Sequence, residues 1–281
     1  MILNTERITS RQNPYVSYVC KLSEKKYRDA EKRFRIDGVK LFYEAIKWEV
    51  AIESVLMTEA AAERVFPELN KVTGNFSVKL LSDSVFSKIS EEKAPEGVIC
   101  VAKHIDKFHK IIKINNGEGK VELDRMRDVS VFILESVRDP GNLGTVIRTA
   151  SAFGVGCLLL SGDCADIYNP KTIRAAMGTM FHQNIVKVDD LCTAIRTLSD
   201  QGRDIYAATL GRDAVLLGDP ELDQRDCIAV GNEGHGLSEA VIEACGKKIL
   251  IPMMPGTESL NAAVASSVCL WEQFGRKLLK K

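Results

Sequence analysis

Residues 249–271 read ILIPMMPGTESLNAAVASSVCLW, and this stretch decides how the rest of the chain is interpreted. A short apolar run enters a turn rich in proline and glycine, and a long helix is predicted after that turn. Polar residues at a helix start leave free backbone N–H groups facing the turn. Those positions hold Glu258, Ser259 and Asn261. The pattern fits a ligand-binding loop, and it equally fits an ordinary strand, turn and capped core helix.

The composition is that of a folded protein with a buried core. The chain has 281 residues, of which 45% are hydrophobic and 27% charged, so one large or two ordinary domains are expected. No apolar run is long enough to predict a membrane span, and the N-terminus lacks the apolar segment of a secretory signal. Eight cysteines form no CxxC pair, and four histidines are scattered. These patterns predict a reduced, cytoplasmic protein without disulfides or a metal centre.

Charge is unevenly distributed, although the formal net charge is zero. Residues 1–40 contain ten basic and five acidic side chains, which gives this segment a net charge of +5. A basic segment can follow a phosphate backbone. Charged runs are more often the solvated face of a helix, so charge alone leaves nucleic-acid binding as one of two interpretations.

The first hundred residues alternate between helical and strand patterns. Helices are predicted at 12–33, 39–48, 59–66 (ending before Pro67) and 83–90, and strands at 34–36, 52–57, 78–81 and 98–102. This order predicts a small α/β domain over residues 1–103. Residues 104–128 are charged and carry turn signals between Asn115 and Gly119, so they are interpreted as a linker that could hold a hairpin.

A second α/β domain is predicted from residue 129 to residue 281. Its strands are continuous apolar runs, as in a parallel sheet covered on both faces, and they are predicted at 131–134, 157–160, 185–188, 205–208 and 227–230. Helices are predicted at 142–153, 170–177, 190–200 and 238–244, and Asn142 is predicted to cap the first of them. The predicted fold class is therefore α/β with a parallel sheet.

Three loops of this second domain follow strands, at 135–143, 231–237 and 252–260. In an open parallel sheet, loops at the carboxyl ends of strands build the ligand crevice. GNEGHG, at 231–236, has three glycines in six residues and lets a backbone approach a ligand closely, although it is neither a GxGxxG fingerprint nor a Walker A motif. A plain glycine turn is the alternative. Arg148, in the helix after PGN, is by residue type alone better explained as a surface ion pair.

Three segments carry a family resemblance. PGNLGTVIRTASAFG, AVGNEGHGLS and ILIPMMPGTESLNAAVASSVCLWE, in this order, resemble the three motifs of the TrmH/SpoU family of RNA ribose 2′-O-methyltransferases, in the SPOUT class. NPKTIRAAMGTMF is similar to that family's intermediate stretch. The first hundred residues resemble, in pattern only, the ribosomal-protein-like RNA-binding extension of rRNA-directed members.

The resemblance implies a Rossmann-like parallel sheet whose C-terminal segment forms a deep trefoil knot. General topology rules would argue against such a knot. S-adenosylmethionine is implied as the cofactor, bent within the knot. Gly231, Ile251 and Leu260 match the family's cofactor-contacting positions, and Thr209 and Gly211 are expected to line the same pocket. A homodimer is also implied, and the small-residue helix that follows fits a close interface.

Five polar residues match the family's catalytic positions: Asn142, Arg148, Glu233, Ser259 and Asn261. Arg148 is expected to have the central role. A guanidinium hardly deprotonates in proteins, so Arg148 is interpreted as a phosphate clamp and a stabiliser of the developing alkoxide, not as a base. Glu233 and Asn142 are expected to orient Arg148 or the ribose, and Ser259 and Asn261 to position the substrate and shape the cofactor pocket.

The expected substrate is RNA, with rRNA favoured over tRNA. Contacts to the RNA are expected from Arg11, Lys25, Arg33, Lys171 and Arg174. Two other functions remain open: an RNA-binding ribosome assembly factor of the same fold without turnover, and a methyltransferase for small molecules. The complete set of five catalytic positions weighs against the first, and the basic N-terminal domain weighs against the second. The sequence does not give the target nucleotide.

Overall fold

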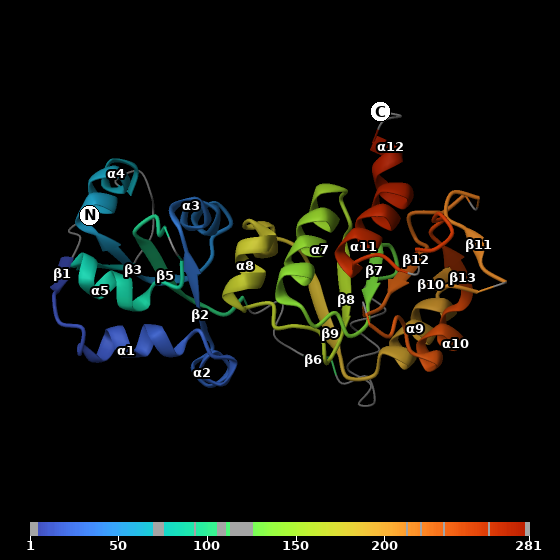
Figure 1. Cartoon of the computed structure of the whole chain (residues 1–281), viewed down its shortest axis with the longest axis horizontal. Coiled ribbons are helices and arrows are strands. Elements are labelled where there is room, and N and C mark those ends of the chain that lie inside the picture. Colours follow the sequence, from blue (N-terminus) through green and yellow to red (C-terminus); the bar gives the residue numbers. More distant parts are fainter. Residues whose placement is uncertain are drawn as a thin grey trace. The chain divides into compact units, whose positions relative to one another are not determined.

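The computed structural model describes residues 5–69, 76–92, 94–105, 111–112, 126–211, 213–219, 221–232, 234–257 and 259–278. These residues form two compact units, and Figure 1 labels their elements. The first unit combines residues within Met1–Ile105 with Asp166–His182. The second combines residues within Asp106–Ala165 and Gln183–Lys281. Each unit is therefore assembled from two separate segments of the chain.

The first unit is built around a five-stranded mixed sheet. In sheet order its strands are β1 (Thr5–Ile8), β4 (Ser77–Leu81), β3 (Ile52–Thr58), β5 (Val98–Lys103) and β2 (Arg33–Asp37). β5 runs antiparallel to both of its neighbours, and the other pairs are parallel. The helices are α1 (Pro14–Lys21), α2 (Lys25–Glu31), α3 (Val39–Lys47), α4 (Glu59–Leu69), α5 (Asp83–Ile89), α8 (Pro170–Ala176) and the short η3 (Thr179–Phe181).

Most elements of this unit lie where the apolar periodicity predicted them, with three differences. The helix predicted at 170–177 was assigned to the second domain, but Asp166–His182 belongs to this unit. α4 was predicted to stop before Pro67 but continues to Leu69. Pro67 has no N–H to donate to the carbonyl of Glu63, so α4 runs through its last residues without that hydrogen bond. β1 was not predicted, since three of the four residues in its sequence TERI are polar. It is an edge strand that pairs with β4 alone.

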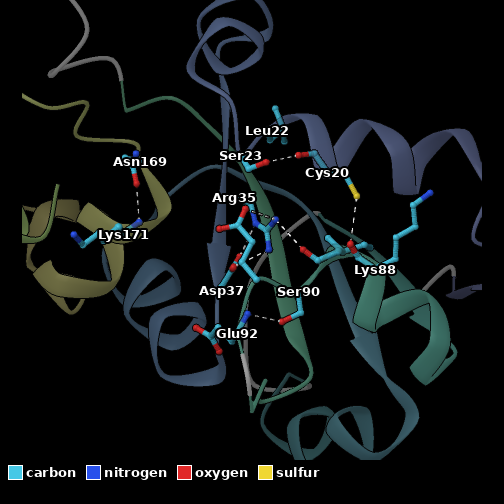
Figure 2. A network of polar contacts seen from close by, with 12 residues as sticks. Cys20, Leu22, Ser23, Arg35, Asp37, Lys88, Ser90, Glu92, Asn169 and Lys171 are labelled. Atoms are coloured by element: carbon cyan, nitrogen blue, oxygen red, sulfur yellow. Dashed lines mark hydrogen bonds and ion pairs between the residues drawn. The ribbon is translucent and has the colours of Figure 1, made fainter. Parts of the chain in front are cut away.

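Two arginines from the basic N-terminal segment are buried in this unit. Arg35 is 1% exposed and donates to both carboxylate oxygens of Asp37, at 2.9 and 2.7 Å, and to the carbonyl of Ile89 at 3.0 Å (Figure 2). Arg28 is also 1% exposed and donates to the Asp166 carboxylate at 2.6 and 3.1 Å. These side chains are satisfied core groups, so the net charge of residues 1–40 overstates the charge that solvent meets.

The second unit contains an eight-stranded sheet in which every pair is parallel. In sheet order its strands are β11 (Val215–Leu216), β13 (Gly246–Leu250), β10 (Ile205–Ala208), β12 (Cys227–Val230), β7 (Val131–Leu134), β8 (Cys157–Ser161), β9 (Ile185–Val188) and β6 (Ile111–Ile112). The helices are α7 (Pro140–Ala152), α9 (Leu191–Asp200), α10 (Glu239–Cys245), α11 (Ala262–Leu270), the π-helical η4 (Trp271–Gly275) and α12 (Arg276–Leu278). The predicted α/β class with a parallel sheet is confirmed.

The core of this unit explains why its central strands β7, β10 and β12 are apolar throughout. Alternate residues of β7, β8, β10 and β12 pack with the apolar sides of α9 and α10 on one face of the sheet. α7 and α11 pack against each other, and α11 also contacts β12. Burial on both faces removes the polar alternation that a one-sided sheet would show.

Three further sequence predictions can be compared with this unit. Asn142 does not cap α7; the cap is Asp139, whose carboxylate accepts from the Asn142 N–H at 2.9 Å. The DPG turn that was predicted to precede the helix is thus its first turn, because proline is well tolerated at the first helical position. Part of the predicted linker forms β6, which pairs with β9, while the possible hairpin between Asn115 and Gly119 lies outside the described residues. No helix among the described residues is long and apolar enough to cross a membrane.

Candidate functional site

A cavity of about 640 Å³ lies where β10, β12 and β13 end in the second unit. The loops that follow these three neighbouring strands form its walls, as expected for a ligand crevice at the carboxyl edge of a parallel sheet. It is lined by Ala208, Thr209, Leu210, Val230, Gly231, Asn232, Gly234, His235, Gly236, Leu250, Ile251, Met253, Ser259, Leu260, Ala262 and Ala265. Apolar walls with a few polar groups are typical of cofactor sites of this size.

The GNEGHG loop folds back on itself beside this cavity. Asn232 and Gly236 exchange backbone hydrogen bonds at 3.1 and 2.8 Å, and the Asn232 side chain accepts from the Gly234 N–H at 2.8 Å. A Cβ on Gly231 would lie 2.2 Å from the carbonyl carbon of Gly236. Only glycine fits at position 231, and the tight loop exposes backbone groups to the cavity.

Neighbouring loops hold the GNEGHG loop in place. The Asn232 amide donates to the carbonyl of Ser136 at 2.9 Å, and Ser136 has a left-handed backbone with φ 54°. The Ser136 hydroxyl donates to Asp163 at 2.6 Å. Burial raises the pKa of the Asp163 carboxyl, but hydrogen bonds from Ser136, Ser161 and Arg138 outweigh it and lower that pKa to about 2. Asp163 therefore stays ionised as an anchor for this network.

The third loop leads into α11 through a side-chain cap. The Asn261 carboxamide oxygen accepts from the N–H groups of Ala263 and Val264 at 3.0 and 3.3 Å. Its amide nitrogen donates to the Asn142 side chain at 3.2 Å, which joins residues 119 positions apart. Two of the five predicted catalytic residues are thus in contact, and both stand at helix starts near the same edge of the sheet.

α7 and α11 lie side by side and run in the same direction. Asn142 contacts Asn261, the hydroxyls of Thr149 and Ser267 lie 3.4 Å apart, and Phe153 meets Trp271 edge to face at 5.7 Å. Arg148 lies on the exposed side of α7 and makes no hydrogen bond or ion pair with any residue that the structure describes. It is not among the residues that line the cavity.

The predicted cofactor and catalytic residues differ in where they lie. Thr209, Gly231, Ile251, Leu260 and Ser259 all line the cavity. Gly211 does not line it, and a Cβ at position 211 would lie 3.0 Å from the Asp213 carboxylate. Glu233 lies outside the described residues, so its side chain is not placed.

Sequence reasoning missed several residues at this site, among them Asn232, His235 and Met253. The signal for Asn232 was present, since it is a polar residue between glycines in a loop already singled out. No local signal marks Ser136 as its support, because that contact spans 96 positions.

The basic residues expected to contact RNA lie in the first unit and differ in their surroundings. Arg11 is exposed, Lys25 pairs with Asp29, and Arg33 donates to both carboxylate oxygens of Glu53 at 2.5 and 2.9 Å. On α8, the exposed Lys171 has its backbone N–H capped by Asn169 at 2.9 Å (Figure 2). Arg174 lies 3.8 Å from Asp37 and keeps a third of its side chain exposed.

The described part of the chain contains no site arranged for thiol or metal chemistry. No group of three His, Cys, Asp or Glu side chains there could hold a metal ion. Burial raises the pKa of Cys157 and of Cys269 to about 12, so neither thiol is available as a thiolate nucleophile. The polar side chains that line the cavity belong to Thr209, Asn232, His235 and Ser259, and such groups orient a substrate through hydrogen bonds.

The parallel sheet, the cavity at its carboxyl edge and the paired polar helix starts define a cofactor-dependent enzyme of the α/β class. Two family descriptions match the chain: SpoU rRNA Methylase family over residues 130–271, and MRM3-like substrate binding domain over residues 13–100. The chain belongs to the SpoU rRNA methylase family.

Relatives resemble the chain over nearly its whole length. The 23S rRNA (guanosine(2553)-2′-O)-methyltransferase RlmP of Bacillus subtilis is 31% identical over 96% of this chain and 100% of its own length. An uncharacterized tRNA/rRNA methyltransferase of Synechocystis is 29% identical over 94% and 92% of the two chains. The crystal structure of an AdoMet-bound rRNA methyltransferase from Sinorhizobium meliloti has 27% identity, 98% coverage of both chains and a TM-score of 0.79. An RNA 2′-O ribose methyltransferase structure has 26% identity, coverage of 97% and 99%, and a TM-score of 0.78.

These similarities show the activity class. The protein is an S-adenosylmethionine-dependent methyltransferase that acts on ribose 2′-hydroxyls of rRNA.

Proposed function

We propose that the cavity at the ends of β10, β12 and β13 binds S-adenosylmethionine and that the methyl group passes from there to an RNA ribose. The observation that carries this proposal is the convergence of three loops on one cavity of about 640 Å³, with the Asn142–Asn261 contact beside it. The residues fit the cofactor. Leu250, Ile251 and Leu260 offer apolar walls, and the loop after Gly231 offers backbone groups at close range.

Each catalytic residue that the structure describes is assigned a role that its surroundings support, and Glu233 is assigned its role from the family resemblance alone. When bound, the cofactor supplies an electrophilic sulfonium methyl group, so the protein must align the 2′-oxygen and stabilise negative charge on it. Asn142 and Asn261 hold each other in place and are suited to orienting the ribose. Ser259, at the cavity rim, is suited to positioning the substrate. Glu233 keeps its expected role of orienting Arg148 or the ribose.

Arg148 is proposed to clamp a phosphate and stabilise the alkoxide. Its exposed, unpaired guanidinium is available to an RNA phosphate, and its permanent positive charge suits an anion better than it suits proton abstraction.

A homodimer is proposed through the exposed side of α7 and α11. Val264, Val268 and Trp271 are 49%, 37% and 41% exposed and recur at positions i, i+4 and i+7, so they form one apolar stripe on the helix. Arg148 stands on the adjacent helix and outside the cavity of its own chain. Covering this stripe with a second copy would bury the apolar side chains and bring Arg148 close to a neighbouring subunit.

We also propose that the C-terminal segment is knotted. β13 lies between β10 and β11, although β11 and β12 both precede it in the chain. After α11, the chain contacts the loop that precedes β12. Gln273 donates to the carbonyls of Asp223 and Asp226 at 3.3 and 2.7 Å, and Lys277 donates to that of Leu222 at 2.6 Å. Such contacts are expected if the C-terminal segment passes through the loop at 209–226. An experimental backbone trace on both sides of β13 tests this topology.

Domain roles follow the same assignment. Residues 1–103 are proposed to bind RNA, residues 104–128 to link, and residues 129–281 to catalyse, which the two family matches support. RNA contacts are proposed for Arg11, Lys25, Arg33, Lys171 and Arg174. Arg33 and Lys25 would first have to release their carboxylate partners. A cytoplasmic location stays a prediction. It is supported by the eight cysteines, all of which are free thiols, as is usual in a reducing compartment.

The test is transfer of labelled methyl groups from S-adenosylmethionine to total RNA, fractionated into rRNA and tRNA. Wild-type protein should label one rRNA species. Arg148→Ala should lower transfer by 100-fold or more, as expected for loss of a major electrostatic stabiliser, with cofactor affinity nearly unchanged. Arg196→Ala, which removes an exposed arginine from α9, is the matched control and should retain activity. Label in tRNA alone, or an active Arg148→Ala protein, would contradict the assignment.

A further inference from the structure

Trp48 is unusual in the first unit. Among the described residues of that unit, it is the only large hydrophobic side chain left exposed, at 40%. The other exposed apolar side chains of this kind belong to the second unit. A single exposed apolar side chain is common on a protein surface, so the surroundings of Trp48 must carry the argument. Tryptophan is enriched at binding interfaces, because its ring is apolar and its N–H is polar.

The Trp48 ring is held rigidly. Its backbone N–H ends α3 by donating to the carbonyl of Glu44 at 3.1 Å, and the next residue, Glu49, turns the chain away with φ 54°. One face of the indole stacks on His182, with ring centroids 4.0 Å apart and planes 26° apart. A preformed ring loses little conformational entropy when a ligand stacks on it.

The glycine turn before η3 permits this stack. Gly178 has φ +87°, and a Cβ there would lie 2.7 Å from the Cβ of Glu44. Glycine therefore allows the η3 segment, which His182 follows, to approach α3 closely. A purely structural role, fastening η3 to α3, would account for the stack but leaves the exposed ring surface unexplained.

Positive charge lies on the same face of α3. Positions 40, 44, 47 and 48 share one side of a helix, and Lys40 and Lys47 are about 10 Å apart along its axis. The Lys47 ammonium is 5.4 Å from the Trp48 ring centroid, and its 65% exposed side chain makes, among the described residues, a single long ion pair of 3.9 Å with Glu44. Lys40 is exposed and has no ion-pair partner among the described residues.

We propose that Lys40, Lys47 and Trp48, here named the α3 platform, bind a single-stranded part of the RNA substrate. An unpaired nucleobase stacks on the exposed part of the Trp48 ring, the Lys47 ammonium moves off that ring, and the two ammonium groups contact the flanking phosphates. Unpaired bases in RNA are typically recognised by stacking on aromatic rings next to basic side chains. This inference rests on the proposed RNA methyltransferase function and adds a binding site that none of the catalytic residues supplies.

Fluorescence provides a direct test, because the chain contains only two tryptophans. Trp271→Phe leaves Trp48 as the sole tryptophan of the full-length protein. Titration with protein-free 23S rRNA should quench its emission, since a stacked base quenches an indole. The reciprocal Trp48→Phe protein, which reports Trp271 alone, should respond far less. Absence of quenching at an RNA concentration that saturates binding would overturn the proposal.

Substitutions then separate stacking from charge. Trp48→Ala should weaken rRNA binding about 10-fold or more, while Trp48→Phe should retain most of the affinity. Lys40→Ala with Lys47→Ala should reduce the slope of log affinity against log salt by roughly 1.4, whereas Lys26→Ala, an exposed lysine on α2, should change affinity little. Unchanged rRNA affinity in Trp48→Ala would also overturn the proposal. So would a titration in which an unrelated protein quenches the Trp48 emission and RNA does not.

Methyl transfer is measured in parallel to separate the two proposals. If wild-type protein methylates rRNA and Trp48→Ala does so with an unchanged KM, the α3 platform is wrong while the enzyme function stands. If Trp48→Ala raises KM for rRNA and leaves kcat nearly unchanged, both are supported. If wild-type protein transfers no methyl group but rRNA still quenches Trp48, the site stands and the proposed function fails.

Discussion

At the scale of single residues, Gly231 shows how one missing Cβ shapes the cavity. A methyl group there would meet the backbone of Gly236 at 2.2 Å and that of Leu237 at 2.4 Å, and neither can move as a flexible side chain could. We expect Gly231→Ala to displace the GNEGHG loop and weaken S-adenosylmethionine binding at least 10-fold, measured by calorimetry. Gly162→Ala is the control, because its Cβ would meet a carbonyl at an ordinary 3.4 Å. Equal affinity in both variants would contradict the assignment of this loop to the cofactor.

Asp163 gives a second prediction at this scale, through pH. Its pKa is about 2 in the folded protein against an ordinary value of 3.8, so its hydrogen bonds favour the folded state above about pH 4. That contribution is lost as pH falls from about 4 through 2. Asp163→Asn should therefore lower stability at pH 7, by about 1 kcal/mol or less because its side chain is 45% exposed. Urea unfolding should show the difference between the two proteins narrowing below pH 4; a difference independent of pH would refute this account.

At the scale of elements, the pairing of α7 with α11 creates the surface proposed for dimerisation. Val268→Asp would place a carboxylate in the middle of the apolar stripe, where burial of an unpaired charge is strongly unfavourable. We expect this variant to be monomeric by light scattering and to lose most methyl transfer while keeping cofactor binding. Val215→Asp, on the exposed strand β11, is the matched control. A wild-type protein that is monomeric at assay concentrations would remove the basis for the prediction.

The elements also show what sequence could and could not predict. Periodicity located most helices and strands, since burial on one or both faces leaves a direct pattern in the residues. It missed the short strands β1, β6 and β11. It placed the cap of α7 three residues too late, because Asp139 and Asn142 are both plausible caps and only the structure shows which one accepts. The contact between Asn142 and Asn261 depends on strand order, and nothing local states that β13 lies between β10 and β11. Charge counting also failed to identify Arg28 and Arg35 as buried, since a charge pattern carries no information about depth.

At the scale of the whole molecule, the first unit depends on a segment that is remote in sequence. Asp166–His182 packs with residues of Met1–Ile105 through the buried Arg28–Asp166 pair, through Tyr168, whose ring centroid is 4.2 Å from that of His104, and through the Trp48–His182 stack. A protein cut after residue 105 would lack these partners. Truncation is therefore a poor test of the first unit. A substitution that weakens the contact between Asp166–His182 and Met1–Ile105 is a better test.

Asp166→Asn is that substitution. It keeps the shape of the side chain and the acceptor for the Tyr168 N–H at 3.0 Å, but it leaves the Arg28 guanidinium, 1% exposed, without its counter-ion. Removing one partner of a buried pair typically costs about 3 kcal/mol, so thermal unfolding of the first unit should shift to lower temperature. Adding Arg28→Met should restore part of the loss, because no unpaired charge then remains in the core. Glu53→Gln, in the partly exposed Arg33–Glu53 pair of the same unit, should cost less than about 1 kcal/mol. If Asp166→Asn proved as mild as Glu53→Gln, the remote segment would not be a structural part of the first unit, and the rigid stack beneath Trp48 would lose its support.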